Sequence, residues 1–156
     1  MTNYPKDYNR EARRKPEPVD LTVWPKDLRW AYWVFVAAAV VMAASGLVGF
    51  FGQNQEATGE FAEFLKANRH FVSAVNLGGA VIIALIAPQL SRAMKHGRSI
   101  LAAVVGLGSF CNVAAIAIGA GGLLLVLIVA LLVTATYLMY RPAPNEFVRE
   151  RNRPRL

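Results

Sequence analysis

The fold class follows from one uncharged stretch in the first third of the chain, WAYWVFVAAAVVMAASGLVGFF at residues 30–51. The stretch contains no Asp, Glu, Lys, Arg or His. About 20 residues at a rise of roughly 1.5 Å each cover a hydrocarbon core about 30 Å thick, so this run predicts a membrane-spanning segment. Lipid offers no partner to a free backbone N–H or C=O group, and the segment is therefore expected to be α-helical.

Three further apolar stretches follow, at about residues 71–90, 99–119 and 122–140, and they are equally free of Asp, Glu, Lys, Arg and His. Hydrophobic residues make up 55% of the 156 residues and are concentrated in these four runs. The sequence therefore predicts an all-α polytopic membrane protein. Its core is a four-transmembrane-helix bundle at residues 29–141.

The segments outside the spans are polar. Residues 1–28 combine mixed charges with four prolines, a composition typical of a disordered tail. Residues 52–70 form the predicted extracytoplasmic loop, whose apolar residues recur at i, i+3 and i+4 and indicate a short amphipathic helix on the membrane or leading into the next span. Residues 142–156 are predicted to be a solvated, basic cytoplasmic tail.

Lysine and arginine are distributed unevenly between the two sides of the predicted bundle. Fifteen of them lie in the two tails and in the turn that holds Arg92, Lys95 and Arg98, whereas only Lys66 and Arg69 lie on the other side. Short loops rich in Lys and Arg stay in the cytoplasm. Both termini and this basic turn are therefore predicted to be cytoplasmic, an N-in/C-in topology.

The same distribution accounts for the net charge of +7, so nucleic acid is not predicted as a partner. Each basic residue near the surface attracts anionic lipid headgroups by about 1 kcal/mol, which makes such lipids candidate partners. Aromatic rings favour the membrane interface, and the first and last spans carry them at their cytoplasmic ends. The predicted interfacial anchors are Trp30, Trp33, Tyr137 and Tyr140.

Polar side chains inside the spans are few. Asn76 and Asn112 both lie roughly 9 to 12 Å below the outer ends of their helices, so they are expected to meet. With Ser73 and Ser109 they form either a helix–helix polar contact, worth about 0.6 to 2 kcal/mol, or the lining of a small polar cavity. The contact is favoured, because ion-coupled transporters usually carry an intramembrane carboxylate or histidine.

Motifs for catalysis or cofactor binding are not found in the sequence. It has no glycine-rich phosphate loop, paired carboxylates, Ser/His/Asp set or metal-ligand cluster. The single cysteine, Cys111, lies in an apolar run and provides neither a disulfide framework nor a zinc-binding spacing. We therefore predict a non-enzyme with no catalytic, cofactor-binding or metal-binding residues.

The start of the first span and the end of the chain together carry one resemblance to a known group of proteins. The segment WPKDLRWAYW at residues 24–33, the alanine- and valine-rich span after it and the Arg-Pro-Ala-Pro sequence at 141–144 before an arginine-rich end resemble the small uncharacterised four-span membrane proteins of actinobacteria. This resemblance implies the plasma membrane of a high-GC bacterium. It implies no activity and no site residues.

Two functions are consistent with these features. The first is an accessory or scaffolding subunit of an envelope or respiratory membrane complex, with a membrane protein or further copies of the chain as partner besides the bilayer. The alternative is a small oligomeric transporter or channel with a polar cavity at Asn76 and Asn112.

Overall fold

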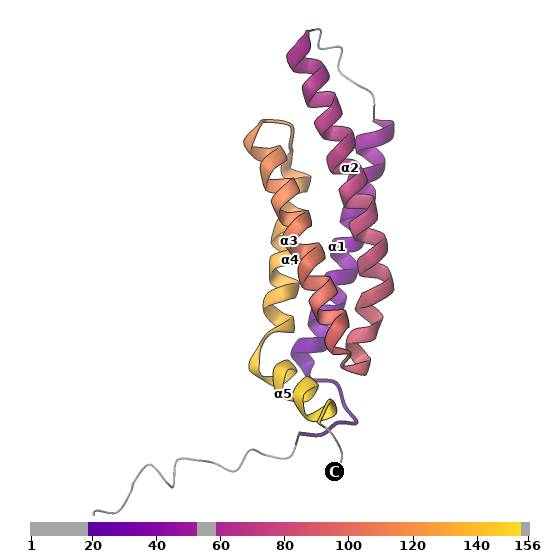
Figure 1. Ribbon diagram of the computed structural model, residues 1–156, viewed down its shortest axis with the longest axis vertical. Helices are drawn as coiled ribbons and strands as arrows, with labels where there is room; N and C mark the ends of the chain where they lie inside the picture. Colours follow the sequence, from indigo (N-terminus) through magenta and orange to yellow (C-terminus); the bar gives the residue numbers. More distant parts are fainter. Residues whose placement is uncertain (1–18, 53–58, 154–156) are drawn as a thin grey trace, which may run out of the picture.

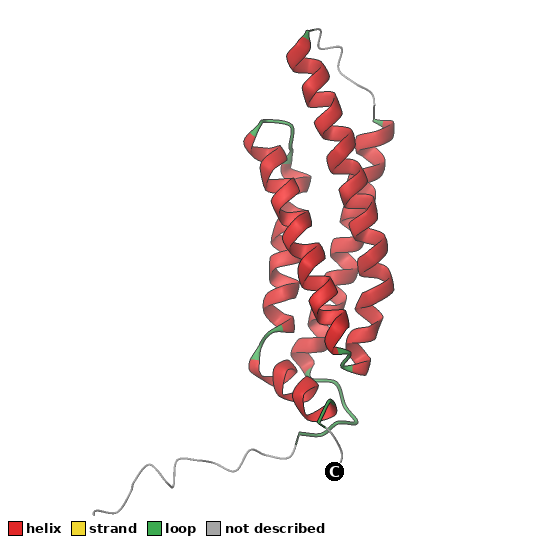
Figure 2. Ribbon diagram, viewed as in Figure 1, coloured by secondary structure: helices red, strands yellow, loops and turns green. Residues whose placement is uncertain are grey.

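The computed structural model describes residues 19–52 and 59–153, and every regular element in these ranges is helical (Figure 2). The predicted all-α class is confirmed for this part of the chain. The elements are α1 (Lys26–Phe51), α2 (Glu60–Ile86), the 3₁₀ helix η1 (Ala87–Arg92), α3 (Lys95–Ala117), α4 (Leu123–Met139) and α5 (Pro142–Arg151).

The long helices α1 to α4 run side by side along the long axis of the molecule, and α5 lies across one end of them (Figure 1). Each long helix packs against two others, in the order α1, α2, α3, α4 and back to α1. We call the end that holds α5, η1 and the start of α1 the α5 end, and the end that holds Phe51 and the α3–α4 turn the opposite end. Both ends of the described chain lie at the α5 end (Figure 1).

Within the described residues, three helices are long and apolar enough to cross a membrane, and a fourth crossing results if α4 and α5 count as one span bent by 57°. α4 alone has 17 residues, which is short for a membrane-spanning helix. At 1.5 Å per residue it is about 25 Å long, somewhat less than a typical hydrocarbon core.

Two helices start earlier than the apolar runs predict. α1 begins at Lys26 and includes Leu28, which is completely buried, so the predicted tail is shorter than 28 residues. α2 begins at Glu60, so the last part of the predicted 52–70 loop forms the first turns of this helix. Backbone hydrogen bonding does not require apolar side chains, and helices therefore continue past the apolar run. Residues 1–18 of the predicted tail and 53–58 of the loop lie outside the described residues.

The predicted basic tail differs most from the structure. Residues 142–151 form α5, which buries Pro144, Phe147 and Val148 against the end of the bundle. These three residues are spaced i, i+3 and i+4 and therefore lie on one face of a helix. Pro142 occupies the first helical position, where its missing N–H group is not needed. Residues 154–156 lie outside the described residues.

Glycines bring α1 and α2 unusually close together. A Cβ atom added at Gly46 would lie 2.9 Å from the backbone oxygen of Ser73, and one added at Gly49 would overlap the Ser73 hydroxyl. Small residues at a helix interface let the two backbones approach and gain van der Waals contact. The α1–α2 contact at the opposite end therefore depends on the absence of side chains at these two positions.

We expect Gly46→Ala to lower the free energy of unfolding by about 1 to 3 kcal/mol, because the backbone oxygen of Ser73 cannot move aside without separating α1 from α2. Gly78 is the matched control, since a Cβ atom there meets nothing within 4 Å. Gly78→Ala should stabilise the protein by up to about 1 kcal/mol through helix propensity. The measurement is SDS-induced unfolding in mild detergent, followed by circular dichroism. Equal effects of the two substitutions would contradict the close approach.

Candidate functional site

The structure brings Asn76 of α2 and Asn112 of α3 into direct contact in the middle of the bundle. Asn76 Nδ2 donates to Asn112 Oδ1 at 3.1 Å, and Asn112 Nδ2 donates to Asn76 Oδ1 at 2.8 Å. Asn112 Nδ2 also donates to the backbone oxygen of Gly108 at 2.7 Å. Both side chains are completely buried. The two amides thus satisfy each other in a closed ring of hydrogen bonds.

Met42 of α1 packs against Gly79 and Gly108, which lie about one helical turn from Asn76 and Asn112. It is completely buried. Its Cε atom lies 2.6 Å from the position of a Cβ atom at Gly79 and 3.9 Å from one at Gly108. The glycines on α2 and α3 therefore make room for an apolar side chain next to the amides. A flexible thioether fills such irregular gaps well.

The two serines of the predicted set do not join the asparagines. Ser73 is buried, and its hydroxyl donates to the backbone oxygen of Arg69 at 2.7 Å, on the side of α2 that faces α1. The Ser109 hydroxyl is buried and has no hydrogen-bond partner among the described residues. The four residues therefore do not form one continuous polar lining. The asparagine pair is a polar contact in its own right.

A second polar cluster joins α3, α4 and α5 at the α5 end. Arg98 Nη2 donates to the backbone oxygen of Met139 at 2.9 Å and to Asn145 Oδ1 at 2.6 Å, while the guanidinium lies 4.6 Å from the centre of the Tyr140 ring. Asn152 Nδ2 donates to the backbone oxygen of Ala93 at 2.9 Å. The last carbonyl groups of a helix lack partners within the helix, and Arg98 supplies a donor for one of them.

Arg98 therefore differs from the other residues of the predicted basic turn. Only 8% of it is exposed, whereas Arg92 is exposed. Lys95 is the first residue of α3. A basic residue beside an apolar run has the same effect on membrane topology whether or not its side chain has a partner. The sequence therefore gave no indication that Arg98 contacts Asn145. The structure assigns Arg98 to the packing of α5.

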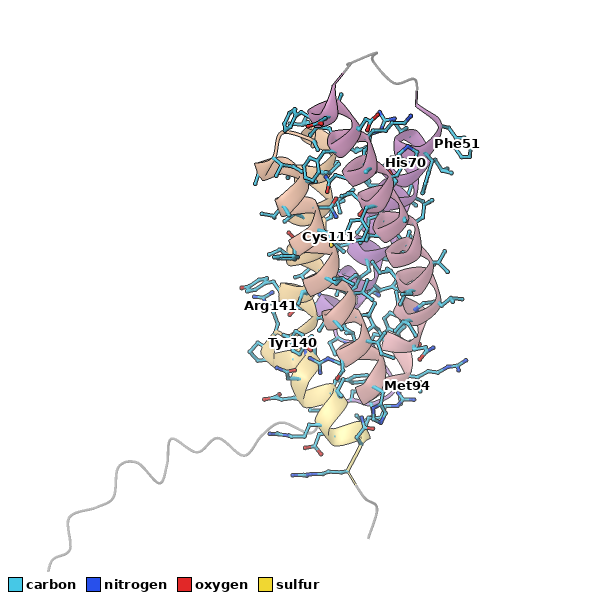
Figure 3. All side chains as sticks on the ribbon, turned by 45° about the horizontal axis from the view of Figure 1, so that its top comes forward. Phe51, His70, Met94, Cys111, Tyr140 and Arg141 are labelled. Atoms are coloured by element: carbon cyan, nitrogen blue, oxygen red, sulfur yellow. The ribbon has the colours of Figure 1, made fainter. Side chains whose placement is uncertain are left out.

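The predicted interfacial aromatics are exposed on α1, in the last turn of α4 and directly after it, at the α5 end. Their exposed fractions are 63% for Trp30, 58% for Trp33, 65% for Tyr137 and 45% for Tyr140. Figure 3 shows Tyr140 and Arg141 near the start of α5, far from Phe51 and His70. Arg141 also forms an ion pair with Asp27 at 3.0 Å, which ties the α4–α5 connection to the first turn of α1.

Groups that could hold a metal ion do not gather in the described part of the chain. No three His, Cys, Asp or Glu side chains in residues 19–52 and 59–153 are placed to hold a metal ion. Cys111 is buried and unpaired, and Figure 3 shows it midway along the bundle. A comparison with family models, curated proteins and solved structures finds no match to this chain.

We expect Asn76→Leu and Asn112→Leu each to destabilise the protein by roughly 1 to 3 kcal/mol, since each leaves a buried amide without its partner. The double substitution removes both amides and should be less harmful than the sum of the two. The expected coupling energy is about 0.6 to 2 kcal/mol, measured as a double-mutant cycle in the SDS titration. Strictly additive effects would mean that the two amides do not stabilise each other.

Arg98→Gln should loosen α5, because the backbone oxygen of Met139 and the side chain of Asn145 lose a charged donor. We expect the backbone amides of α5 to exchange with deuterium about tenfold faster, measured by mass spectrometry of the protein in detergent. Arg92→Gln removes the same charge from the exposed neighbouring turn and serves as the control. If both variants raised the rate of deuterium exchange in α5 equally, a specific role for Arg98 would be ruled out.

Proposed function

We propose that this chain is a non-catalytic, four-span protein of the bacterial plasma membrane that serves as an accessory or scaffolding subunit of an envelope or respiratory membrane complex. The closed Asn76–Asn112 pair carries the proposal. The most polar groups deep in the bundle bind each other and are completely buried, so they are not available to a substrate. A domain of this kind acts through the contacts that its outer surface makes.

Its orientation is supported by the charges of the α5 end. The described start of the chain, the connection between η1 and α3 and the helix α5 all lie there (Figure 1). These are the segments in which Lys and Arg are concentrated, and such segments stay in the cytoplasm. Exposed Arg149, Arg153 and Lys26 would then face the anionic lipids of the inner leaflet. The proposed topology has both termini in the cytoplasm.

The outer surface of the described helices has a recess that could hold a partner helix. A groove of about 380 Å³ runs between α1 and α2, and alanines at positions 39, 43, 80 and 84 form much of its lining, with Tyr32 and Pro88 near the α5 end. Small residues let a neighbouring helix approach closely, and in lipid such packing drives helix association. We assign this groove to a transmembrane helix of the larger complex.

The alternative, a small oligomeric transporter or channel, has less support. Its polar cavity would be lined by Asn76 and Asn112, whose amides already satisfy each other, and Ser73 lies on another side of α2. Opening the pair would leave two buried amides without partners, at a cost of roughly 1 to 3 kcal/mol for each. A well-folded double leucine variant that had lost the flux of a substrate would favour this alternative.

The proposal is tested by affinity purification of the tagged protein from its native membrane in mild detergent, with mass spectrometry of the proteins that accompany it. We expect a membrane complex in stoichiometric amounts. Ala84→Phe fills the groove and should abolish this recovery. Ala103→Phe introduces the same ring at an exposed position of α3 outside the groove, and it should leave recovery unchanged.

Recovery of the wild-type protein alone, or only as a homo-oligomer, would overturn the assignment to a larger complex. If both phenylalanine variants reduced recovery equally, the contact with the complex would have to lie outside the groove. Circular dichroism and the elution volume of each variant establish beforehand that both proteins are folded.

A further inference from the structure

One face of α1 carries basic and indole side chains together where the helix starts, at the α5 end of the bundle (Figure 1). The residues are Lys26, Arg29, Trp30 and Trp33, and all four are exposed. Their spacing is i, i+3, i+4 and i+7, so they lie within about 100° of one another around the helix axis. We call these four residues the basic–aromatic face.

The order of groups along this face matches the order of groups in a phospholipid. The two cations come first, and the indoles follow one turn nearer the middle of the bundle. The same side of α1 continues through Ala37 and Ala44, which are also exposed. At 1.5 Å per residue, Ala44 lies about 16 Å beyond Trp33, roughly half of a hydrocarbon core about 30 Å thick. The face therefore has the length of a lipid in a single leaflet.

The ring of Trp33 is held in place by other aromatic side chains. The centre of the Tyr32 ring lies 5.2 Å from that of Trp33 in an edge-to-face arrangement, and Trp24 packs in the same way on Tyr32 at 6.0 Å. Such pairs favour particular ring orientations. Since Trp33 is already positioned, less conformational entropy is lost when a molecule binds to it.

The cation at the end of α4 is used differently. Arg141 forms an ion pair with Asp27 at 3.0 Å, and its guanidinium lies 5.9 Å from the centre of the Tyr137 ring. Packing within the bundle thus engages this charge. It also engages Asp27, the carboxylate that lies between Lys26 and Arg29 in the sequence. Lys26 and Arg29 are themselves exposed, so their charges are accessible from outside the bundle.

We propose that the basic–aromatic face binds one anionic phospholipid, with the phosphate between Lys26 and Arg29 and an acyl chain along the apolar part of the face. A guanidinium forms paired hydrogen bonds to phosphate, and an ammonium adds a point charge. Indole N–H groups donate at the depth where headgroup and chain join. An acidic protein segment would match the two charges but not the apolar stretch beyond them.

The lipid site adjoins the groove between α1 and α2 but is distinct from it, because none of its four residues belongs to the lining of the groove. A lipid and a partner helix can therefore bind side by side. The site rests on the proposed membrane topology, which places the basic–aromatic face in the inner leaflet. It does not depend on the accessory role.

The experiment reconstitutes the full chain in phosphatidylcholine vesicles that contain a minor share of phosphatidylglycerol, and it measures tryptophan fluorescence. Bromine atoms on an acyl chain quench a tryptophan only when that lipid lies beside it. Brominated phosphatidylglycerol is compared with the same share of brominated phosphatidylcholine. We expect stronger quenching by phosphatidylglycerol. Lys26→Gln and Arg29→Gln should each lower this preference about fivefold, the factor expected for one basic residue at an anionic surface.

The double variant Lys26→Gln/Arg29→Gln is matched by Arg92→Gln/Arg149→Gln, which removes the same charge from exposed positions of η1 and α5. The matched variant should keep the preference of the wild type. Equal losses in the two double variants would overturn the site, because the lipid would then respond only to the net charge of the α5 end. Equal quenching of the wild type by the two brominated lipids would also overturn it.

The result is independent of the other proposals. Phosphatidylglycerol is present in both leaflets of the vesicle, so the measured preference does not depend on the direction in which the protein inserts. A wrong topology, or purification of the protein without a membrane complex, would leave the preference unchanged. Circular dichroism of each variant establishes beforehand that it is folded.

Discussion

The close contact between α1 and α2 determines how the rest of the bundle is oriented. Without side chains at Gly46 and Gly49, α1 lies against the turn of α2 that holds Ser73. Residues three apart on a helix differ by about 60° in direction, since one turn takes 3.6 residues. With Ser73 directed toward α1, Asn76 is therefore directed toward α3 and reaches Asn112. One glycine-mediated contact thus orients the polar residue that joins the next pair of helices.

Polar contacts join the elements of the bundle at two levels. The asparagine pair links α2 to α3 in the middle, where both amides are buried. At the α5 end, Arg98 links α3 to the last carbonyl of α4 and to Asn145 of α5. Each contact satisfies groups that would otherwise be buried without partners. A polar group in an apolar interior has few alternatives, so these contacts restrict the register between helices as well as adding stability.

The structure divides the surface into regions with different physical properties. The flanks are largely apolar and include a recess lined by alanines between α1 and α2. The α5 end carries exposed aromatic and basic side chains. At the opposite end, a small cavity of about 210 Å³ lies where α1, α2 and α4 meet. Contact with other helices suits the flanks.

The sequence alone determined the helical class and the approximate limits of the apolar helices. Both follow from local composition, since uncharged runs of about 20 residues have few other stable structures. It also predicted that Asn76 and Asn112 would lie at matching depths, because rise per residue converts position into height. Only the tertiary structure decided that the two amides face each other while Ser73 and Ser109 do not join them.

The tertiary structure also decided that residues 142–151 pack as a helix and that Arg98 binds Asn145. Charge counts could not find these contacts, because a basic residue contributes equally to topology whether it is solvated or buried. The contacts depend on how each helix is rotated about its axis and on partners far away in the chain, 47 positions for Arg98 and Asn145. Packing sets that rotation, and local composition does not encode it.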